Sequence, residues 1–278
     1  MDVLWPLIGS WPLPLKLGFL GVAIALLILL RYFAFTSIAF GFSRLIERYS
    51  PMRRLQSKPF TSKQIKREIG YSMLSVLTFT GVVGVIILMS QAGWTRIYSD
   101  ASKHGVLWFW LQIPVALLIQ DWYFYWMHRI VHAPGIYEYV HNAHHRSTNP
   151  TAFAAFAFHP FEAFLEIGIF LIIVLIIPMH SIALLFVGGF SLAFNVYGHL
   201  GYEVMPRFIG KSPLGYMLNK SAYHNQHHRT YRYNYGLYTA IWDRLHGTLH
   251  PEAEQLYDRA TKLETKEGLG GNASIRSE

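Results

Sequence analysis

The chain has 278 residues, of which 52% are hydrophobic and only 14% are charged. Soluble domains carry about a quarter of charged residues, so this composition indicates a single membrane-embedded domain. There is no cysteine, which excludes disulfides and thiolate metal ligands. The net charge of +8 fits nucleic acid or an anionic membrane surface. The apolar composition favours the membrane, so no nucleic-acid partner is expected.

The first three apolar stretches, 15–42, 71–90 and 106–127, predict membrane-spanning helices, because about 20 apolar residues cross a bilayer. A signal peptide competes for the first stretch. Three features favour a span instead. The run is long, the N-terminal region before it lacks the positive charge of a signal peptide, and no small-residue cleavage site follows.

A fourth apolar region, 161–198, is interrupted at Pro178–Ser181. It predicts either two crossings joined by a tight turn or a helical hairpin that enters from one side. Both alternatives return the chain to the same face of the membrane. Residues 1–260 are therefore expected to form one all-α integral membrane domain with about four spans or hairpins, and 261–278 a flexible tail.

The loop Arg44–Arg67 holds eight Lys or Arg residues. Short basic loops stay on the cytoplasmic side, whereas the weakly basic Gln91–His104 should face away from it. The histidine-rich segment that follows the third span is then a cytosolic helical cap. The multi-pass protein is expected in a bacterial inner membrane or the endoplasmic reticulum.

Three groups of histidines have a spacing that places their rings on one face of a helix. Helices use pairs four residues apart to offer two imidazoles to one metal ion. Eight ligands are too many for one ion and suit two. The grouped residues are His128, His132, His141, His144, His145, His224, His227 and His228.

Two carboxylates are candidates for orienting ligand rings. Asp121 lies two helical turns before His128, and Asp243 precedes His246. Either carboxylate could accept a ring N–H, which is common around metal ligands. Asp121 could instead pair with a nearby arginine. Weaker candidates for the same role are Glu138, Glu162 and Glu203, while His104, His180 and His250 are expected to be structural.

The motifs HRIVH, HNAHH and HNQHH, in this order, resemble the three histidine boxes of the fatty acid hydroxylase/sterol desaturase superfamily of membrane di-iron enzymes. The likeness covers roughly Lys63–Leu249 and is greatest for the C-5 sterol desaturase branch. The motifs that carry this closer likeness are KREI (Lys66–Ile69), YWMHR (Tyr125–Arg129), TAFAAFAFHPFEAFLE (Thr151–Glu166) and YNYGLYTAIWDRLHGT (Tyr233–Thr248).

The resemblance implies that the eight grouped histidines bind two iron ions and that His199 is a further ligand. Asn195 stands where some relatives have another histidine. It could ligate weakly, hold a water on one iron, or cap a helix. His159 is expected to support a ligand or the fold, and His246 to be a variable surface position.

The resemblance also implies an activity. The irons would reduce O2 with two external electrons and cleave a C–H bond of an apolar lipid, giving an alkene or an alcohol. A sterol is the implied substrate, and a fatty acyl or sphingoid chain is the alternative. A separate donor, such as cytochrome b5 or a ferredoxin with its reductase, would supply the electrons, and the basic loop is a candidate for docking it.

Two other classes stay open. A zinc-dependent membrane hydrolase would need an open metal position beside a catalytic acid, and no His-Glu-x-x-His motif is present. A metal-ion transporter would place polar residues within the spans, whereas these histidines cluster outside them. Zinc could also replace iron in a purified sample.

Overall fold

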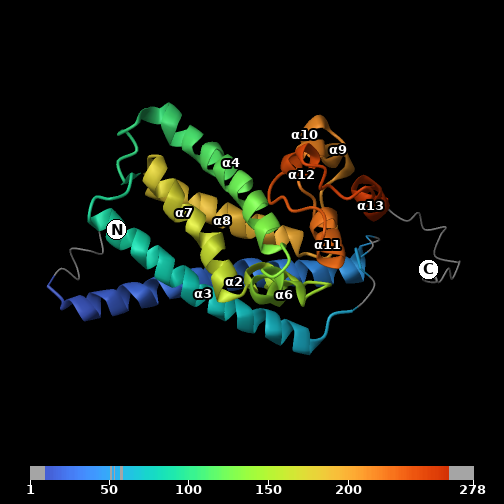
Figure 1. Cartoon of the computed structure of the whole chain (residues 1–278), viewed down its shortest axis with the longest axis horizontal. Helices are drawn as coiled ribbons and strands as arrows, with labels where there is room; N and C mark the ends of the chain where they lie inside the picture. The colour runs from blue at the N-terminus through green and yellow to red at the C-terminus, as the bar shows by residue number, and fades with distance from the viewer. Residues whose placement is uncertain (1–9, 51, 53, 57–58, 263–278) are drawn as a thin grey trace, which may run out of the picture.

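The computed structural model describes residues 10–50, 52, 54–56 and 59–262, and nearly all of its regular structure is helical (Figure 1). This confirms the predicted all-α fold. Beyond position 262, the expected flexible tail lies outside the described residues. Four helices are long and apolar enough to cross a membrane, namely α2 (Leu13–Tyr49), α3 (Ser62–Gln91), α4 (Gly105–Val131) and α8 (Ser181–Gly198).

Two helices extend beyond the predicted spans on the side of the basic loop. α2 continues to Tyr49, seven residues past the expected end. α3 begins at Ser62 because Thr61 caps it, with its Oγ1 accepting from the backbone N of Gln64 at 3.2 Å. A capped polar turn needs no membrane to be stable, so hydropathy alone placed this start too late.

The region 161–198 forms two helices, α7 (Pro160–Ile176) and α8, joined through the two-residue strand β2 (Met179–His180). β2 pairs with β1 (Ile97–Tyr98) in the connection between α3 and α4. The turn therefore lies at the end of the bundle that α3 and α4 also reach. At about 1.5 Å per residue, the 17 residues of α7 extend about 26 Å. This depth favours two crossings over a shallow hairpin.

In the membrane part, α4, α7 and α8 share a hydrophobic core. Ala116 of α4 meets Ile173 of α7 and Val187 of α8, and all three side chains are buried. Arg31, inside the apolar run of α2, is accommodated by the other face of α8. Its guanidinium donates to the carbonyl oxygen of Leu185 at 3.2 Å, beside Gly189.

The remaining short elements form a cap at the opposite end from the β1–β2 pair (Figure 1). Buried Tyr223 and Tyr257 dominate a separate core there. The cap consists of α5 (Tyr137–Val140), α6 (Asn142–His145), the 3-10 helix η1 (Ala152–Phe156), α9 (Arg207–Gly210), α10 (Pro213–Met217), α11 (Ser221–Thr230), α12 (Ile241–Leu245) and α13 (Ala253–Thr261).

Several histidines serve the fold alone. His159 caps α7, with Nδ1 accepting from the backbone N of Phe161 at 3.3 Å. His180 caps α8 in the same way and donates from Nε2 to the carbonyl oxygen of Ser99 at 2.9 Å. His246 stacks on the ring of Tyr125, with 5.2 Å between ring centroids. His180 thus has the structural position expected of it, His159 caps a helix, which is one of its two expected roles, and His246 is exposed.

Candidate metal centre

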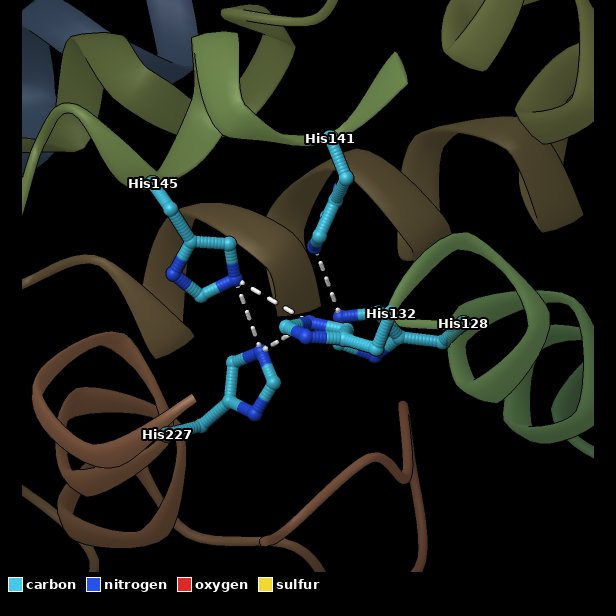
Figure 2. Close-up of side chains that lie close together, drawn as sticks. All are labelled: His128, His132, His141, His145 and His227. Atoms are coloured by element: carbon cyan, nitrogen blue, oxygen red, sulfur yellow. Dashed lines mark hydrogen bonds between the residues drawn. The ribbon is translucent and has the colours of Figure 1, made fainter. Parts of the chain in front are cut away.

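Five of the predicted ligands converge from three separate segments (Figure 2). His128 and His132 come from the end of α4, His141 and His145 from the α5–α6 segment, and His227 from α11. Their Nε2 atoms approach one another across segments, at 3.1 Å for His128 and His141, 3.2 Å for His132 and His145, and 3.1 Å for His145 and His227. We call this set the five-histidine cluster.

The other four predicted ligands, His144, His199, His224 and His228, form a second set, the four-histidine cluster. Its Nε2 atoms lie 3.4 Å apart for His199 and His144, and 3.1 Å for His224 and His199. Within each cluster the candidate ligand atoms all lie within 4.8 Å of one another. The structure thus brings all nine predicted histidines together but divides them between two positions.

Sequence neighbours contribute to different clusters. His144 and His145 are adjacent in α6, as are His227 and His228 in α11, and each pair is split between the clusters. Successive side chains on a helix point about 100° apart, so each helix can face both clusters at once. The ring centroids of His145 and His228 are 4.8 Å apart, so the two clusters are direct neighbours.

Hydrogen bonds from Nδ1 fix the orientation of five of the rings. A carbonyl or carboxylate oxygen can only accept, so Nδ1 must carry the hydrogen and Nε2 must carry the lone pair that faces the cluster. The donor–acceptor pairs are His128 with the carbonyl oxygen of Tyr235 (2.9 Å), His141 with Glu162 Oε1 (2.6 Å), and His144, His199 and His227 with the carbonyl oxygens of Ala157 (3.3 Å), Asn195 (2.7 Å) and Tyr233 (2.6 Å).

This arrangement fits metal ions. Lone pairs that face each other at 3.1–3.4 Å repel unless a cation lies between them. Imidazole–metal bonds of about 2.0–2.1 Å place neighbouring nitrogens about 2.9 Å apart at a right angle and about 3.3 Å apart in a tetrahedron. The observed spacing matches this range. A donor set made only of imidazole suits Fe, Zn, Cu or Ni rather than Mg or Ca.

Burial keeps the cap histidines neutral. It lowers the pKa of His199 to about 4 and that of His144 well below the ordinary value, and the neighbouring imidazoles lower the pKa of His144 further. The same causes act on His132, His141, His145, His224 and His228. Since a metal binds only the deprotonated ring, these ligands are ready for a metal at neutral pH.

Asp121 does not orient a ligand ring, and the prediction that it would do so is wrong. Its Oδ1 accepts from the backbone N of Tyr238 at 2.7 Å and of Thr239 at 3.1 Å, while Oδ2 accepts from Thr239 Oγ1 and from Trp242 Nε1. Asp121 is buried and ties α4 to the start of α12. An apolar helix can hold a carboxylate that accepts four hydrogen bonds, so no arginine partner is required.

Asp243 does not contact a ligand ring but holds the backbone of the loop that does. It accepts from the backbone N of Tyr235 at 2.9 Å and of Gly236 at 2.8 Å. The carbonyl oxygen of Tyr235 accepts from His128, so Asp243 holds the loop that orients the ring rather than the ring itself. Burial raises the pKa of Asp243 to about 6.

The carboxylate that does touch a ligand ring is Glu162, which the sequence supports only as a weaker candidate. Glu203 instead accepts from the backbone N of Ala222 at 2.9 Å at the start of α11, the helix that carries three ligands. Glu138 is exposed and accepts from the backbone N of Gly135 at 3.0 Å. Glu162 reaches the ring of His141 because α7 packs against the cap, a contact that spacing in the chain does not report.

Asn195 lies beside the four-histidine cluster without capping a helix. Its side-chain Nδ2 donates to the carbonyl oxygen of Ala155 at 2.8 Å, and its backbone carbonyl oxygen accepts from Nδ1 of His199 at 2.7 Å. Asn195 and His224 line a cavity of about 20 Å³, which by this measure has room for about one water molecule. Apolar side chains of Phe124, Phe194 and Leu237 line the rest of it together with the neighbouring polar groups.

Residues 113–248, which include both clusters, match the family model of fatty acid hydroxylases. The chain is 30% identical over 209 residues to a Delta(7)-sterol 5(6)-desaturase of Aspergillus fumigatus, covering 75% of this chain and 57% of that protein. It is 30% identical over 200 residues to the lathosterol oxidase of Mus musculus, covering 70% and 64%.

A Delta(7)-sterol 5(6)-desaturase of Leptosphaeria maculans is 32% identical over 179 residues, covering 63% of this chain and 48% of that protein. The chain thus spans about half to two thirds of the length of these relatives. No solved structure matches the chain. On the family match and these similarities, the chain resembles the fatty acid hydroxylase/sterol desaturase superfamily and, within it, the C-5 sterol desaturase members.

Proposed function

We propose that this chain is an iron- and O2-dependent membrane oxidoreductase that introduces a double bond into a sterol of the Delta(7) type. The observation that carries the proposal is the convergence of nine neutral imidazoles on two adjacent positions, within the region that matches the family. The names of the similar proteins support the sterol and the 5(6) position.

Electron counting fixes what the reaction needs. Desaturation removes two hydrogens from the lipid, and O2 takes these together with two electrons and two protons to give two molecules of water. Hydroxylation of the same C–H bond consumes the same two electrons and gives an alcohol and one water. Two bound irons would supply the oxygen chemistry. A separate electron carrier is proposed to supply the two electrons.

The protein's own residues then orient and seal the site. The bonds from Nδ1 to fixed oxygens hold each ring in place, which a metal centre requires for a defined geometry. Asn195 is proposed to accept from a water molecule in the small cavity beside the four-histidine cluster, because Nδ2 is already bonded to Ala155 and no described residue donates to its amide oxygen. The apolar side of that cavity, formed by Phe124, Phe194 and Leu237, is where the lipid is proposed to approach.

The proposed orientation places the cap in the cytosol. The end of α2 and the start of α3, which carry Arg44, Arg48, Lys63, Lys66 and Arg67, lie at the same end of the bundle as the cap (Figure 1). Positively charged loops stay on the cytoplasmic side, which supports an active site on the cytosolic face of a bacterial inner membrane or the endoplasmic reticulum.

A fatty acyl or sphingoid hydroxylase remains the second candidate, because the family model is named for fatty acid hydroxylation. A zinc hydrolase is disfavoured by the donor set. Within the described part of the chain, no carboxylate belongs to either cluster, and Glu162 is engaged with His141. A hydrolytic general base would need such a carboxylate beside the open metal position.

The test uses the full chain in lipid nanodiscs, loaded with Fe(II) and supplied with a Delta(7)-sterol, O2 and dithionite. We expect a conjugated 5,7-diene, measured by mass spectrometry and ultraviolet absorbance, that disappears when iron or O2 is omitted. His144→Ala should abolish it and His104→Gln, outside both clusters, should not. Oxidation of acyl chains alone would favour the second candidate, and anaerobic ester hydrolysis with zinc would refute the proposal.

A further inference from the structure

A basic cleft opens on the surface of the cap between the first turns of α3 and the segment 146–149, which follows α6. It encloses about 320 Å³ and is lined by three cationic side chains, Lys63, Arg67 and Arg146. The other lining residues are uncharged, so the cleft itself contains no carboxylate.

The positive charge of the cleft is uncompensated. Among the described residues, none of Lys63, Arg67 and Arg146 forms an ion pair, whereas other basic residues of the cap side do. Lys211 lies 2.7 Å from Asp258, and Arg44 lies 2.6 Å from Glu47. Three unpaired cations around one hollow produce a local field that attracts an anionic surface.

The cleft is held in shape by hydrogen bonds. Arg67 donates to the carbonyl oxygen of Arg146 at 2.8 Å and to Ser147 Oγ at 3.2 Å. Gln64 donates to the carbonyl oxygen of Asn149 at 2.8 Å. These bonds tie α3 to the segment of chain that leaves α6, so Arg67 and the backbone of Arg146 are fixed relative to each other.

The cleft adjoins the metal centre along the chain. Arg146 follows His144 and His145 in the sequence, and these two buried histidines belong to the four-histidine and the five-histidine cluster, respectively. Arg146 in the wall of the cleft is thus one residue from a candidate ligand of the five-histidine cluster and two residues from one of the four-histidine cluster. Among the features of the cap, this placement distinguishes the cleft from an ordinary basic surface.

We propose that the basic cleft docks the acidic, one-electron carrier protein that reduces the metal centre, an inference that rests on the proposed function. Each turnover needs two electrons, so two reduced carriers bind in succession, and each leaves oxidised by one electron. Neutral histidines do not compensate the positive charge of the bound metals, which also attracts an acidic protein. The cleft lies on the surface, so the carrier meets its charge first. An anionic lipid headgroup would satisfy the charge of the cleft, yet it would not account for the place of Arg146 next to candidate ligands of both clusters.

The test compares two double variants of the iron-loaded chain in nanodiscs of neutral phosphatidylcholine. Lys63→Glu/Arg146→Glu reverses the charge of the cleft and leaves Arg67, which holds the backbone, in place. Arg259→Glu/Lys262→Glu makes the same charge change on α13, outside the cleft. Stopped-flow spectroscopy measures how fast each protein oxidises the reduced soluble domains of cytochrome b5 and of a ferredoxin.

We expect the cleft variant to lower the second-order rate constant about tenfold or more at low ionic strength. The difference should shrink as salt is added, because salt screens the attraction. The control variant should react as the wild type does. Both variants should retain their iron and their turnover with dithionite, which needs no docking and shows that the proteins are folded.

The docking proposal is overturned if the cleft variant reacts as fast as the wild type, if the α13 variant is slowed equally, or if neither carrier reduces the wild type. A cleft variant that reacts normally with the carriers, but loses a dependence of activity on added phosphatidylserine, would identify a lipid headgroup site instead. If dithionite supports no lipid oxidation by the wild type, the proposed function fails separately from the docking site.

Discussion

His141 donates its Nδ1 hydrogen to Glu162 across 2.6 Å, between side chains that are 3% and 1% exposed. In the described part of the chain, Glu162 is the only carboxylate that contacts a ring of either cluster. The other oxygen, Oε2, is buried without a partner. The pair links α7 in the membrane to the five-histidine cluster in the cap.

Removing this carboxylate should weaken the metal at the five-histidine cluster. Partners of this kind fix the ring and raise the basicity of the ligand, and their loss typically costs about 10–100-fold in metal affinity. Glu162→Ala should show this loss in metal titrations of the purified protein. Glu162→Gln keeps an oxygen that accepts from His141 and should lose much less. Equal affinities for Glu162→Ala and the wild type would disprove the role assigned to Glu162.

Asp121 should matter for stability rather than for metal chemistry. Asp121→Ala leaves the donors of Tyr238, Thr239 and Trp242 without their buried acceptor, which costs about 3 kcal/mol. For a chain of this size the melting temperature should fall by roughly 6–12 °C. Thermal unfolding in detergent measures the effect, with the exposed Glu138→Gln as the control that should change little.

Acid should destabilise the metal-free protein. The folded pKa of His199 is about 4, whereas the ordinary value is 6.5, so the unfolded chain binds more protons between these values. Stability is therefore complete above pH 6.5 and falls as the pH decreases towards 4, by about 3 kcal/mol for this histidine alone. Melting temperatures of the metal-free protein at pH 7 and pH 5 test this. A melting temperature that does not change would contradict the burial of neutral rings.

Gly198 should be needed for the four-histidine cluster. A Cβ at this position would lie 3.1 Å from Cδ2 of His224, which leaves no room for a methyl group unless the ring moves. Gly198→Ala should therefore weaken metal binding at that cluster, since overpacking typically costs about 1–3 kcal/mol. Gly168→Ala, on α7 with nothing within 4 Å, is the matched control. Metal titration should show a defect in the first variant only.

Sequence spacing was sufficient to find eight of the nine candidate ligands because a helix carries residues three and four apart on one face, and His199 was added by the family resemblance. It could not assign them to clusters. His144 and His145 point to different clusters, and α11 supplies His227 to one cluster and His228 to the other. That division depends on contacts between segments about 80 residues apart, which spacing does not report.

The groups that orient the rings were largely out of reach of the sequence. The carbonyl oxygens of Ala157, Tyr233 and Tyr235 do this work, and a backbone oxygen has no signature in the side-chain pattern. Asp121 was misassigned for a related reason. Its helical phase relative to His128 is compatible with a contact, but the carboxylate instead accepts from three donors in the loop before α12 and from Trp242 in α12.

The central claim, that nine histidines hold two separate metal ions, is tested most directly by counting metals. Inductively coupled plasma mass spectrometry should find two ions per wild-type chain after loading with Fe(II). His227→Ala removes a ligand of the five-histidine cluster and His199→Ala one of the four-histidine cluster, and each variant should retain one ion per chain. One ion in the wild type, or two in both variants, would contradict the two-cluster account.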